Sequence, residues 1–306
     1  MAEAPLLDCL IIGGGAAGLT AAIYLARYRR RLMLLDGDAS RLHKIPTSHN
    51  YPGFVAGVHG EDLLGRLRAQ ALEYGAPMAT GIVDRLQRND DGSFTAWCGR
   101  QAWHARYVIL ATGVQDVEPG FGEVAEAVAG GQLRYCPICD GFEAIGKRVA
   151  VIGRGDAAVG EAEFIRHFAH ELTLFSVADT PPLSEQSCAR LRAADIGWCP
   201  EPVERLVHED HAVLVQARGQ PARRFDVIYA ALGTLVNGGL AQLLGARASD
   251  EGELHVDDHQ QTTVDGLYAA GDVVLGLNQI AVAMGHAAIA ATAVHNRLRR
   301  QDDRLQ

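Results

Sequence analysis

The feature that most constrains the fold is a strand, a glycine-rich turn and a helix, which follow one another in that order twice. In the first copy the apolar run 6–12 leads into Gly13-Gly14-Gly15-Ala16-Ala17-Gly18 and an Ala-rich helix. In the second copy the run 148–152 leads into Gly153-Arg154-Gly155-Asp156-Ala157-Ala158 and another helix. Short apolar strands alternating with amphipathic helices indicate parallel sheets with right-handed crossovers. The sequence therefore predicts an α/β protein with two Rossmann-like, three-layer dinucleotide-binding domains.

The order of the remaining strands predicts that the second domain is inserted into the first. The strands 107–110 and 227–230 each end in small residues and close one nucleotide-binding unit. A further strand and turn, 266–272, is followed by a helix from about residue 279 to 295. We therefore expect a discontinuous first domain and one inserted domain, with these bounds: 1–116 and 240–306 for the first, and 117–239 for the second.

The first glycine loop has the full context of a dinucleotide-binding fingerprint. It follows a strand, opens a helix, and precedes an acid at a strand end, Asp36, by 21 residues counted from Gly15. Gly13 permits the tight turn, Gly15 lets the backbone approach a pyrophosphate, and Gly18 lets the helix pack close to the sheet. The phosphates are expected on the helix N-terminus, with Asp36 accepting hydrogen bonds from a ribose.

Two of the six cysteines, Cys136 and Cys139, form a Cys-Pro-Ile-Cys pair just ahead of the second domain's first strand. Thiols at this spacing can close a small disulfide, and a helix that starts there stabilises a thiolate. Half of a zinc site is the alternative, but a structural zinc needs two further ligands, and no second Cys-x-x-Cys or close His pair exists. The pair is therefore interpreted as a redox couple, with inert thiols as the other alternative and no metal expected.

Composition excludes several other classes of protein. With 48% hydrophobic and 21% charged residues among 306, the chain reads as a globular protein. Its net charge of -9 disfavours a nucleic-acid partner. No apolar run is long enough to span a membrane, and no secretory leader is visible at the N-terminus, so a cytoplasmic location is expected.

The combination of motifs resembles the low-molecular-weight thioredoxin reductases over nearly the whole chain. Cys136-Pro137-Ile138-Cys139-Asp140-Gly141 lies ahead of the inserted fold, and His49-Asn50-Tyr51-Pro52-Gly53-Phe54 is similar to that family's flavin loop. The resemblance implies an FAD-dependent disulfide oxidoreductase and a homodimer, with thioredoxin or a thioredoxin-like protein as partner. It implies that Cys139 faces the flavin, Cys136 attacks the partner disulfide, and Asp140 carries protons; a helix cap is the alternative role for Asp140.

The fingerprint and the resemblance together predict a set of FAD contacts. His286, in the C-terminal helix, is either an ordinary helical histidine or a flavin-side residue. The predicted contacts are Gly13, Gly15, Ala16, Ala17, Asp36, Gly37, Arg41, Asn50, Val83, Ala111, Thr112, Gly113, Gly271, Asp272, Gln279 and Ile280.

The electron donor stays open, because the second nucleotide site departs from the family pattern. Family members place a His-Arg-Arg stretch after the strand that follows the loop, and its arginines grip the 2′-phosphate of NADPH. Here residues 175–179 read Phe-Ser-Val-Ala-Asp, so that charge-assisted contact is missing. NADPH or NADH used weakly, and reduced ferredoxin, are the donors considered. Two other functions stay open: an oxygen-dependent dithiol oxidase, against which Asp140 argues, and a non-enzymatic flavin redox sensor.

Overall fold

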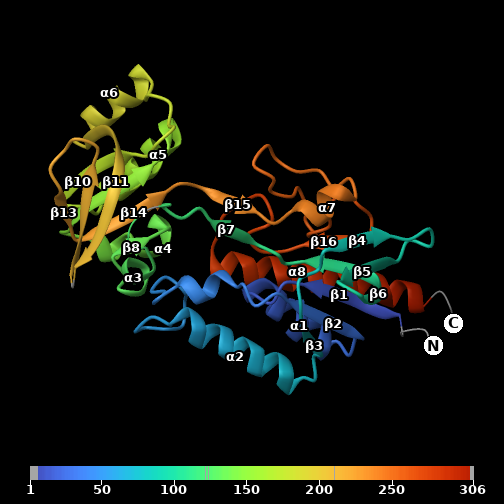
Figure 1. Cartoon of the computed structure of the whole chain (residues 1–306). Coiled ribbons are helices and arrows are strands. Elements are labelled where there is room, and N and C mark those ends of the chain that lie inside the picture. The colour runs from blue at the N-terminus through green and yellow to red at the C-terminus, as the bar shows by residue number, and fades with distance from the viewer. Residues whose placement is uncertain (1–5, 121, 123, 210, 304–306) are drawn as a thin grey trace. The chain divides into compact units, whose positions relative to one another are not determined.

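The chain folds into two compact units, shown in Figure 1. This computed structural model describes residues 6–120, 122, 124–209 and 211–303. Unit 1 comprises the described residues up to 47, then 51–115, and those from 235 onward, whereas unit 2 comprises 48–50 and the described part of 116–234. Residues 235–239, expected in the inserted domain, group with unit 1, because Asn237 donates its backbone N–H to the carbonyl of Gly113.

Unit 1 is built on a sheet whose central strands are parallel. The strand order is β3-β2-β1-β6-β5-β4, and β16 also pairs with β6. Strand β6 is long: its first half pairs antiparallel with β5, and its second half pairs parallel with β1 and β16. The elements are β1 (Leu7–Ile12), α1 (Ala16–Arg27), β2 (Leu32–Asp36), η1 (Arg41–Lys44), α2 (Gly60–Glu73), β3 (Met78–Thr80), β4 (Arg85–Arg88), β5 (Phe94–Cys98), β6 (Gln101–Leu110), α7 (Gly239–Leu243), β16 (Leu267–Ala269) and α8 (Ile280–Asp302).

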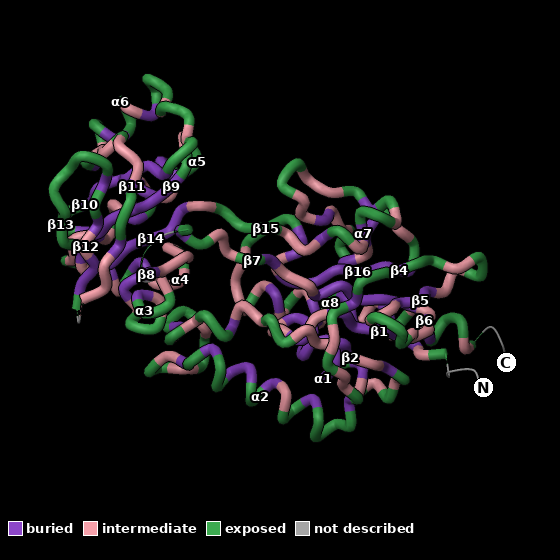
Figure 2. Tube along the Cα trace, in the orientation of Figure 1, coloured by how far each residue is buried: buried purple, intermediate pink, exposed green. Residues whose placement is uncertain are grey.

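The core of unit 1 lies on both faces of this sheet, because strand side chains alternate between the faces. Cys9 and Ile11 of β1 join a buried cluster with residues of α1, α2 and α8. Leu10 and Ile12 join a second cluster with β4, β5, α7 and the segment that leads to β16. The buried strands in Figure 2 therefore form the middle of three layers.

Unit 2 has its own sheet, in the order β13-β12-β11-β10-β9-β14-β8. Strands β8, β9, β10 and β14 run parallel, whereas β12 and β13 form an antiparallel extension on β11. The elements are α3 (Val124–Ala129), β8 (Leu133–Arg134), α4 (Pro137–Asp140), η2 (Phe142–Ala144), β9 (Arg148–Gly153), α5 (Gly155–Arg166), β10 (Glu171–Ser176), α6 (Glu185–Ala193), β11 (Gly197–Glu209), β12 (Ala212–Ala217), β13 (Arg223–Phe225) and β14 (Val227–Ala231).

The same alternation divides the core of unit 2. Val149 and Val151 of β9 pack with α5 and α6 on one face, and Ala150 and Ile152 pack with α3 and the antiparallel strands on the other. The predicted α/β fold class is confirmed: each unit is a three-layer, dinucleotide-binding-type domain built on its own sheet. The two chain crossings between the units, β7 (Val114–Asp116) and β15 (Thr234–Val236), pair with each other as a two-stranded sheet.

The structure differs from the sequence expectation in detail. The C-terminal helix continues to Asp302, seven residues past the predicted end, where Asp302 pairs with Arg30 of unit 1 (2.9 Å). Helix α5 ends at Arg166, three residues earlier than expected. The antiparallel strands β4, β5 and β11–β13 were not predicted. No local motif marks them, and they form because they pair with neighbouring strands.

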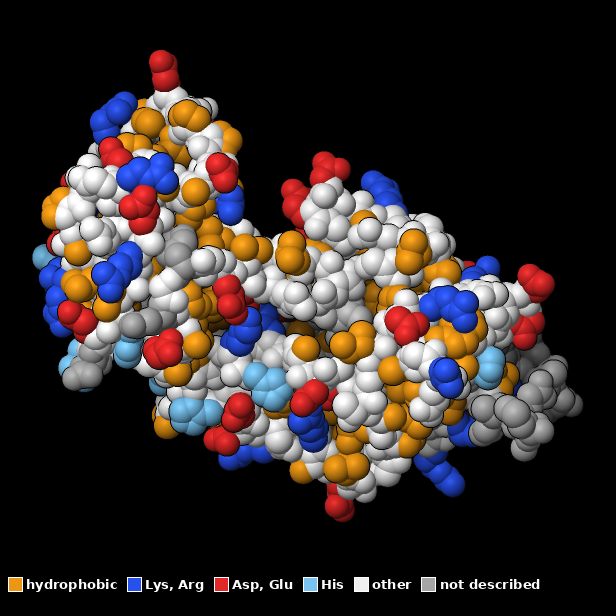
Figure 3. Space-filling view, viewed as in Figure 1, with side chains coloured by type: hydrophobic (Ala, Val, Ile, Leu, Met, Phe, Trp, Pro, Cys, Tyr) orange, Lys and Arg blue, Asp and Glu red, His pale blue; other side chains and the backbone are white. Residues whose placement is uncertain are grey.

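Across the described ranges, no helix combines the length and apolar character that a bilayer span requires. Among these same residues, no three His, Cys, Asp or Glu side chains gather as a metal-binding group. On the face drawn in Figure 3, basic and acidic side chains are interspersed over each unit.

Candidate functional site

In unit 1, the residues predicted to bind the cofactor gather at one edge of the sheet. Strands β1, β2, β6 and β16 are parallel, so their carboxyl ends meet at the same edge. In open α/β sheets ligands bind at such an edge. The segments that leave it carry most of the predicted set: Gly13 to Ala17 after β1, Asp36 and Gly37 at the end of β2, Ala111 to Gly113 after β6, and Gly271 and Asp272 after β16.

The glycines of the first loop are there for steric reasons. Gly13 has φ +115°, and a Cβ on it would lie 2.2 Å from the carbonyl oxygen of Ala111. A Cβ on Gly18 would lie 1.8 Å from the carbonyl oxygen of Gly13. The loop can therefore pack against the end of β6 and against α1 only without side chains at these positions. Gly271 approaches the loop in the same way, since its Cβ would meet that of Ala17 at 3.0 Å.

Gly15 differs from Gly13 and Gly18, because the protein itself leaves room for a side chain there. Its backbone is extended (φ −81°, ψ −166°), and an added Cβ would meet only Ser40 Oγ, at 3.4 Å. It is the N-cap of α1 and provides no side-chain cap for the first N–H groups of the helix. Such a helix terminus suits a phosphate group.

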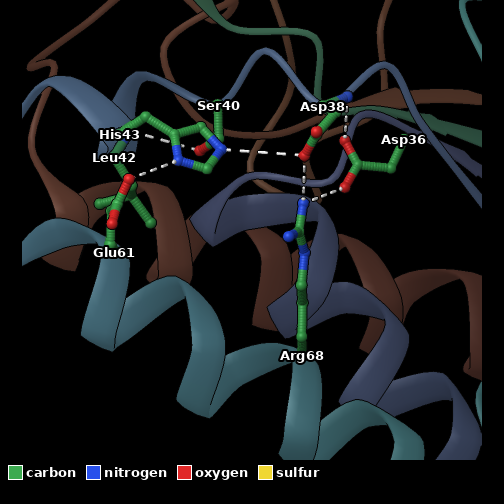
Figure 4. Close-up of polar contacts among 7 residues, drawn as sticks. All are labelled: Asp36, Asp38, Ser40, Leu42, His43, Glu61 and Arg68. Atoms are coloured by element: carbon green, nitrogen blue, oxygen red, sulfur yellow. Dashed lines mark hydrogen bonds and ion pairs between the residues drawn. The ribbon is translucent and has the colours of Figure 1, made fainter. Parts of the chain in front are cut away.

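Asp36 lies in a network that the sequence did not predict, drawn in Figure 4. Arg68 of α2 donates from one nitrogen to Asp36 Oδ2 (2.8 Å) and to Asp38 Oδ1 (2.9 Å), and the N–H of Asp38 donates to Asp36 Oδ1 (2.9 Å). The hydrogen bond from Arg68 lowers the pKa of Asp38. His43 lies between Asp38 (3.8 Å) and Glu61 (3.6 Å). A carboxylate has about four acceptor positions, so Asp36 retains capacity for ribose hydroxyls.

On the other side of the edge, Arg41 and Asp272 form an ion pair (3.1 Å) in which both side chains are largely buried, at 24% and 18% exposure. His286 of α8 is close enough to this pair for Asp272 to raise its pKa, although burial has the larger effect and lowers it. Its Nδ1 is buried without a hydrogen-bond partner among the described residues, and so is Oδ1 of Asn278. Orphaned polar atoms at a strand-end edge are consistent with a polar ligand.

The remaining predicted contacts are placed as follows. Thr112 and Gly113 are fixed by Asn237, which accepts from Thr112 Oγ1 (2.7 Å) through its carbonyl and donates from Nδ2 to the carbonyl of Thr112 (3.0 Å). A Cβ on Gly37 would lie 3.1 Å from Ile82, the neighbour of buried Val83. Gln279 is the N-cap of α8, which begins at Ile280. Asn50 groups with unit 2.

In unit 2, Cys136 and Cys139 form a disulfide, with their Cα atoms 5.3 Å apart. Cys136 is the N-cap of the short helix α4, and Pro137 takes the first helical position, where its missing N–H costs nothing. Cys136 Sγ accepts a hydrogen bond from the backbone N–H of Cys139 (3.2 Å). A donor at this sulfur stabilises negative charge there once the disulfide is reduced, which suits Cys136 as the attacking thiolate.

Asp140 is the last residue of α4, directly after the second cysteine. Burial raises the pKa of its carboxyl to about 6, although the Arg134 guanidinium and a hydrogen bond from Tyr229 act in the opposite direction. An acid with a pKa close to neutral can both donate and accept a proton under ordinary conditions. The residue is thus a chemically suitable proton carrier next to the disulfide.

The second glycine loop follows β9 and opens α5, as predicted. Its one basic residue, Arg154, is the N-cap of α5, and no arginine follows the next strand at the position where the family binds a 2′-phosphate. Asp156 of the loop accepts from the backbone N–H of Ser184 (3.1 Å). Arg190 of α6 is held by Glu163 in a two-point contact (2.9 and 2.5 Å). The turn after β10, residues 177–184, contains an acid, Asp179, and no basic residue.

Four residues that form hydrogen bonds to the predicted site residues were not predicted from the sequence. Asn237 precedes a glycine, a turn signal that could have marked it. Arg68 and Tyr229 had no local signal, because each meets its partner only through tertiary structure. Arg134 lies six residues before its partner Asp140, but no motif marks it.

Comparisons with known proteins agree with this geometry. The family model described as pyridine nucleotide-disulphide oxidoreductase matches residues 7–287. Thioredoxin reductase of Bacillus subtilis is 28% identical over 97% of this chain and 96% of its own length, and that of Mycolicibacterium smegmatis is 32% identical over 87% and 88%. The crystal structure of thioredoxin reductase from Streptococcus pyogenes superimposes with a TM-score of 0.89 at 27% identity, covering 96% of this chain and 99% of that one. The chain therefore belongs to the pyridine nucleotide-disulphide oxidoreductase family, as a thioredoxin reductase-like, FAD-dependent disulfide oxidoreductase.

Proposed function

We propose that this enzyme reduces the disulfide of thioredoxin or of a thioredoxin-like protein through Cys136 and Cys139. The observation that carries the proposal is the disulfide of these cysteines at the start of α4, directly followed by the buried acid Asp140. The relatives named thioredoxin reductase, matched over nearly their whole length, support this choice of partner. The homodimer implied by the resemblance and the cytoplasmic location expected from the sequence stay predictions.

We further propose that unit 1 is the FAD-binding domain and that unit 2 is the pyridine-nucleotide-type domain. In unit 1 the N–H groups at the start of α1 would bind the pyrophosphate, Asp36 the adenosine ribose, and Asp272, held by Arg41, the ribityl chain. Gly13 and Gly18, where a Cβ would clash with backbone carbonyls, let the loop pack closely at this edge. The FAD, when bound, supplies the electron pair that reduces the Cys136–Cys139 disulfide.

The exchange with the partner balances as follows. The Cys136 thiolate attacks one sulfur of the partner disulfide, the partner S–S bond breaks, and the departing thiolate takes a proton from Asp140. Cys139, as a thiolate, then attacks Cys136 in the mixed disulfide and releases the second partner thiolate, which takes a proton from solvent. The two cysteines are oxidised by two electrons, and the partner disulfide is reduced by two.

We propose that the electron donor is either NADPH or NADH, used weakly, or reduced ferredoxin. The turn after β10 has no guanidinium for a 2′-phosphate, and Arg190 is already occupied by Glu163. Asp140 argues against the oxygen-dependent dithiol oxidase, because the dithiol oxidases that resemble thioredoxin reductases have a histidine directly after the second cysteine.

The decisive experiment replaces one sulfur. Cys136→Ser is expected to give a yellow protein that has lost the reduction of oxidised thioredoxin, measured with chemically reduced enzyme in single turnovers so that the donor does not matter. Cys188→Ser, at a free cysteine on α6, is the matched control and is expected to retain it. Retained thioredoxin reduction by Cys136→Ser would refute the proposed function.

A further inference from the structure

Strand pairing in unit 2 places two side chains beside the acid of the redox motif. In the parallel pair of β14 and β8, Tyr229 lies opposite Arg134. Residues opposite each other on paired strands have side chains on the same face of the sheet. Chain direction then takes the residues after Arg134 directly into Cys136 and α4, so the end of α4 comes back over this pair.

Both side chains bind Asp140. The Tyr229 hydroxyl lies 2.8 Å from Asp140 Oδ1 and 3.0 Å from the carbonyl oxygen of the same residue, and its single proton goes to one of them. Arg134 donates from Nη1 to the carbonyl of Asp140 (2.9 Å) and from Nε to the carbonyl of Gly131 (3.0 Å). Its guanidinium lies 3.7 Å from Asp140 Oδ2 and 3.4 Å from the Tyr229 oxygen. The acid is therefore held at both its backbone and its carboxylate.

Burial makes these contacts more than surface pairing. Tyr229 is fully buried, and the side chains of Arg134 and Asp140 are only 14% and 24% exposed. A phenylalanine would fill the same core space on β14 without placing a hydroxyl in it. A buried hydroxyl is unfavourable unless it has a partner, and here the partner is Asp140.

Four titratable groups from neighbouring segments act on the Asp140 carboxyl. Arg134 on β8, Tyr229 on β14 and Lys147 before β9 stabilise the carboxylate, whereas Glu143 of η2 destabilises it. Burial, the largest effect, raises the pKa of Asp140 to about 6. Loss of either the hydroxyl or the guanidinium leaves burial less opposed, so the pKa would rise further.

We infer that Tyr229 and Arg134 are positioning residues that orient the Asp140 carboxyl, the proton source in disulfide exchange. This inference rests on the proposed function, because it assigns the proton taken by the departing partner thiolate to Asp140. The two residues contact neither sulfur in the structure; they act through the acid. Their oxygen and nitrogen atoms exchange no electrons with the substrate, so the redox balance of the reaction is unchanged.

The test measures Asp140 directly and the reaction separately. In protein labelled with ¹³C at aspartate carboxyls, the Asp140 signal, assigned by its absence in Asp140→Asn, gives a titration midpoint. Tyr229→Phe is expected to raise this midpoint by about one pH unit. The pH profile for thioredoxin reduction should shift the same way: the limb that disappears in Asp140→Asn moves to higher pH in Tyr229→Phe.

Two controls separate positioning from stability. Tyr268→Phe removes another buried tyrosine hydroxyl, one that interacts with Arg297 in unit 1. It is expected to leave both the Asp140 titration midpoint and the midpoint of the pH-profile limb unchanged. Arg134→Lys, which keeps the charge, is expected to stay closer to the parent than Arg134→Gln. If Asp140→Asn abolishes the limb while Tyr229→Phe leaves both midpoints in place, the positioning role is wrong and the proposed function stands. If Asp140→Asn leaves the profile unchanged, the proton role of Asp140 and this inference fall together.

Discussion

Arg41 and Asp272 lie 3.1 Å apart as an ion pair, although 231 positions separate them in the chain. Arg41 begins η1 after β2, and Asp272 follows β16 at the same edge of the unit 1 sheet. The pair ties the two sides of the proposed FAD site together. It also fixes the orientation of the Asp272 carboxylate.

Removal of Arg41 is therefore expected to weaken FAD binding. Arg41→Ala should raise the Kd for FAD about tenfold, or ~1.4 kcal/mol, because Asp272 loses a largely buried partner and its fixed orientation. Titration of the flavin-depleted protein with FAD measures the effect. Arg218→Ala, which breaks the exposed pair with Glu204 in unit 2, is the control and should leave the Kd unchanged. Equal affinities for Arg41→Ala and the parent would count against the proposed role.

The first glycine loop predicts two different outcomes for one added methyl group. Gly18→Ala should prevent correct folding, because its Cβ would overlap the Gly13 carbonyl. Gly15→Ala should fold, with a stability change below about 1 kcal/mol, because the protein leaves room there and the backbone is extended. It should nevertheless lose FAD, since the methyl group would stand where the pyrophosphate approaches α1. Circular dichroism melting and flavin content separate the two; a yellow Gly15→Ala protein with normal FAD affinity would contradict the placement.

The second nucleotide site predicts slow reduction by NADPH. Anaerobic bleaching of the flavin, followed in parallel with NADPH, NADH and reduced ferredoxin, should be slow with NADPH, because the turn after β10 lacks a cation. Ala178→Arg, at an exposed position of that turn, should speed bleaching by NADPH more than by NADH. Rapid, stoichiometric bleaching of the parent at micromolar NADPH would overturn the prediction.

Much of the fold and of the site follows from local sequence. The two glycine loops, the strands before them and the Cys136–Cys139 spacing are continuous segments, and each predicts its own structure through backbone sterics and hydrophobic periodicity. Helix α8 was located but its end was not, because its last turns are stabilised by tertiary pairs such as Arg30 with Asp302.

The sequence by itself determined the fold class, the strand-end glycines and the disulfide with its neighbouring acid, because these depend on residues close together in the chain. Only the tertiary structure decided three sets of hydrogen bonds. Arg68 binds Asp36, Asn237 binds Thr112, and Tyr229 and Arg134 bind Asp140. The physical reason is that most of these hydrogen bonds join residues far apart in the chain, so they depend on strand order and register. Neither is encoded in the spacing of the residues that form the bond.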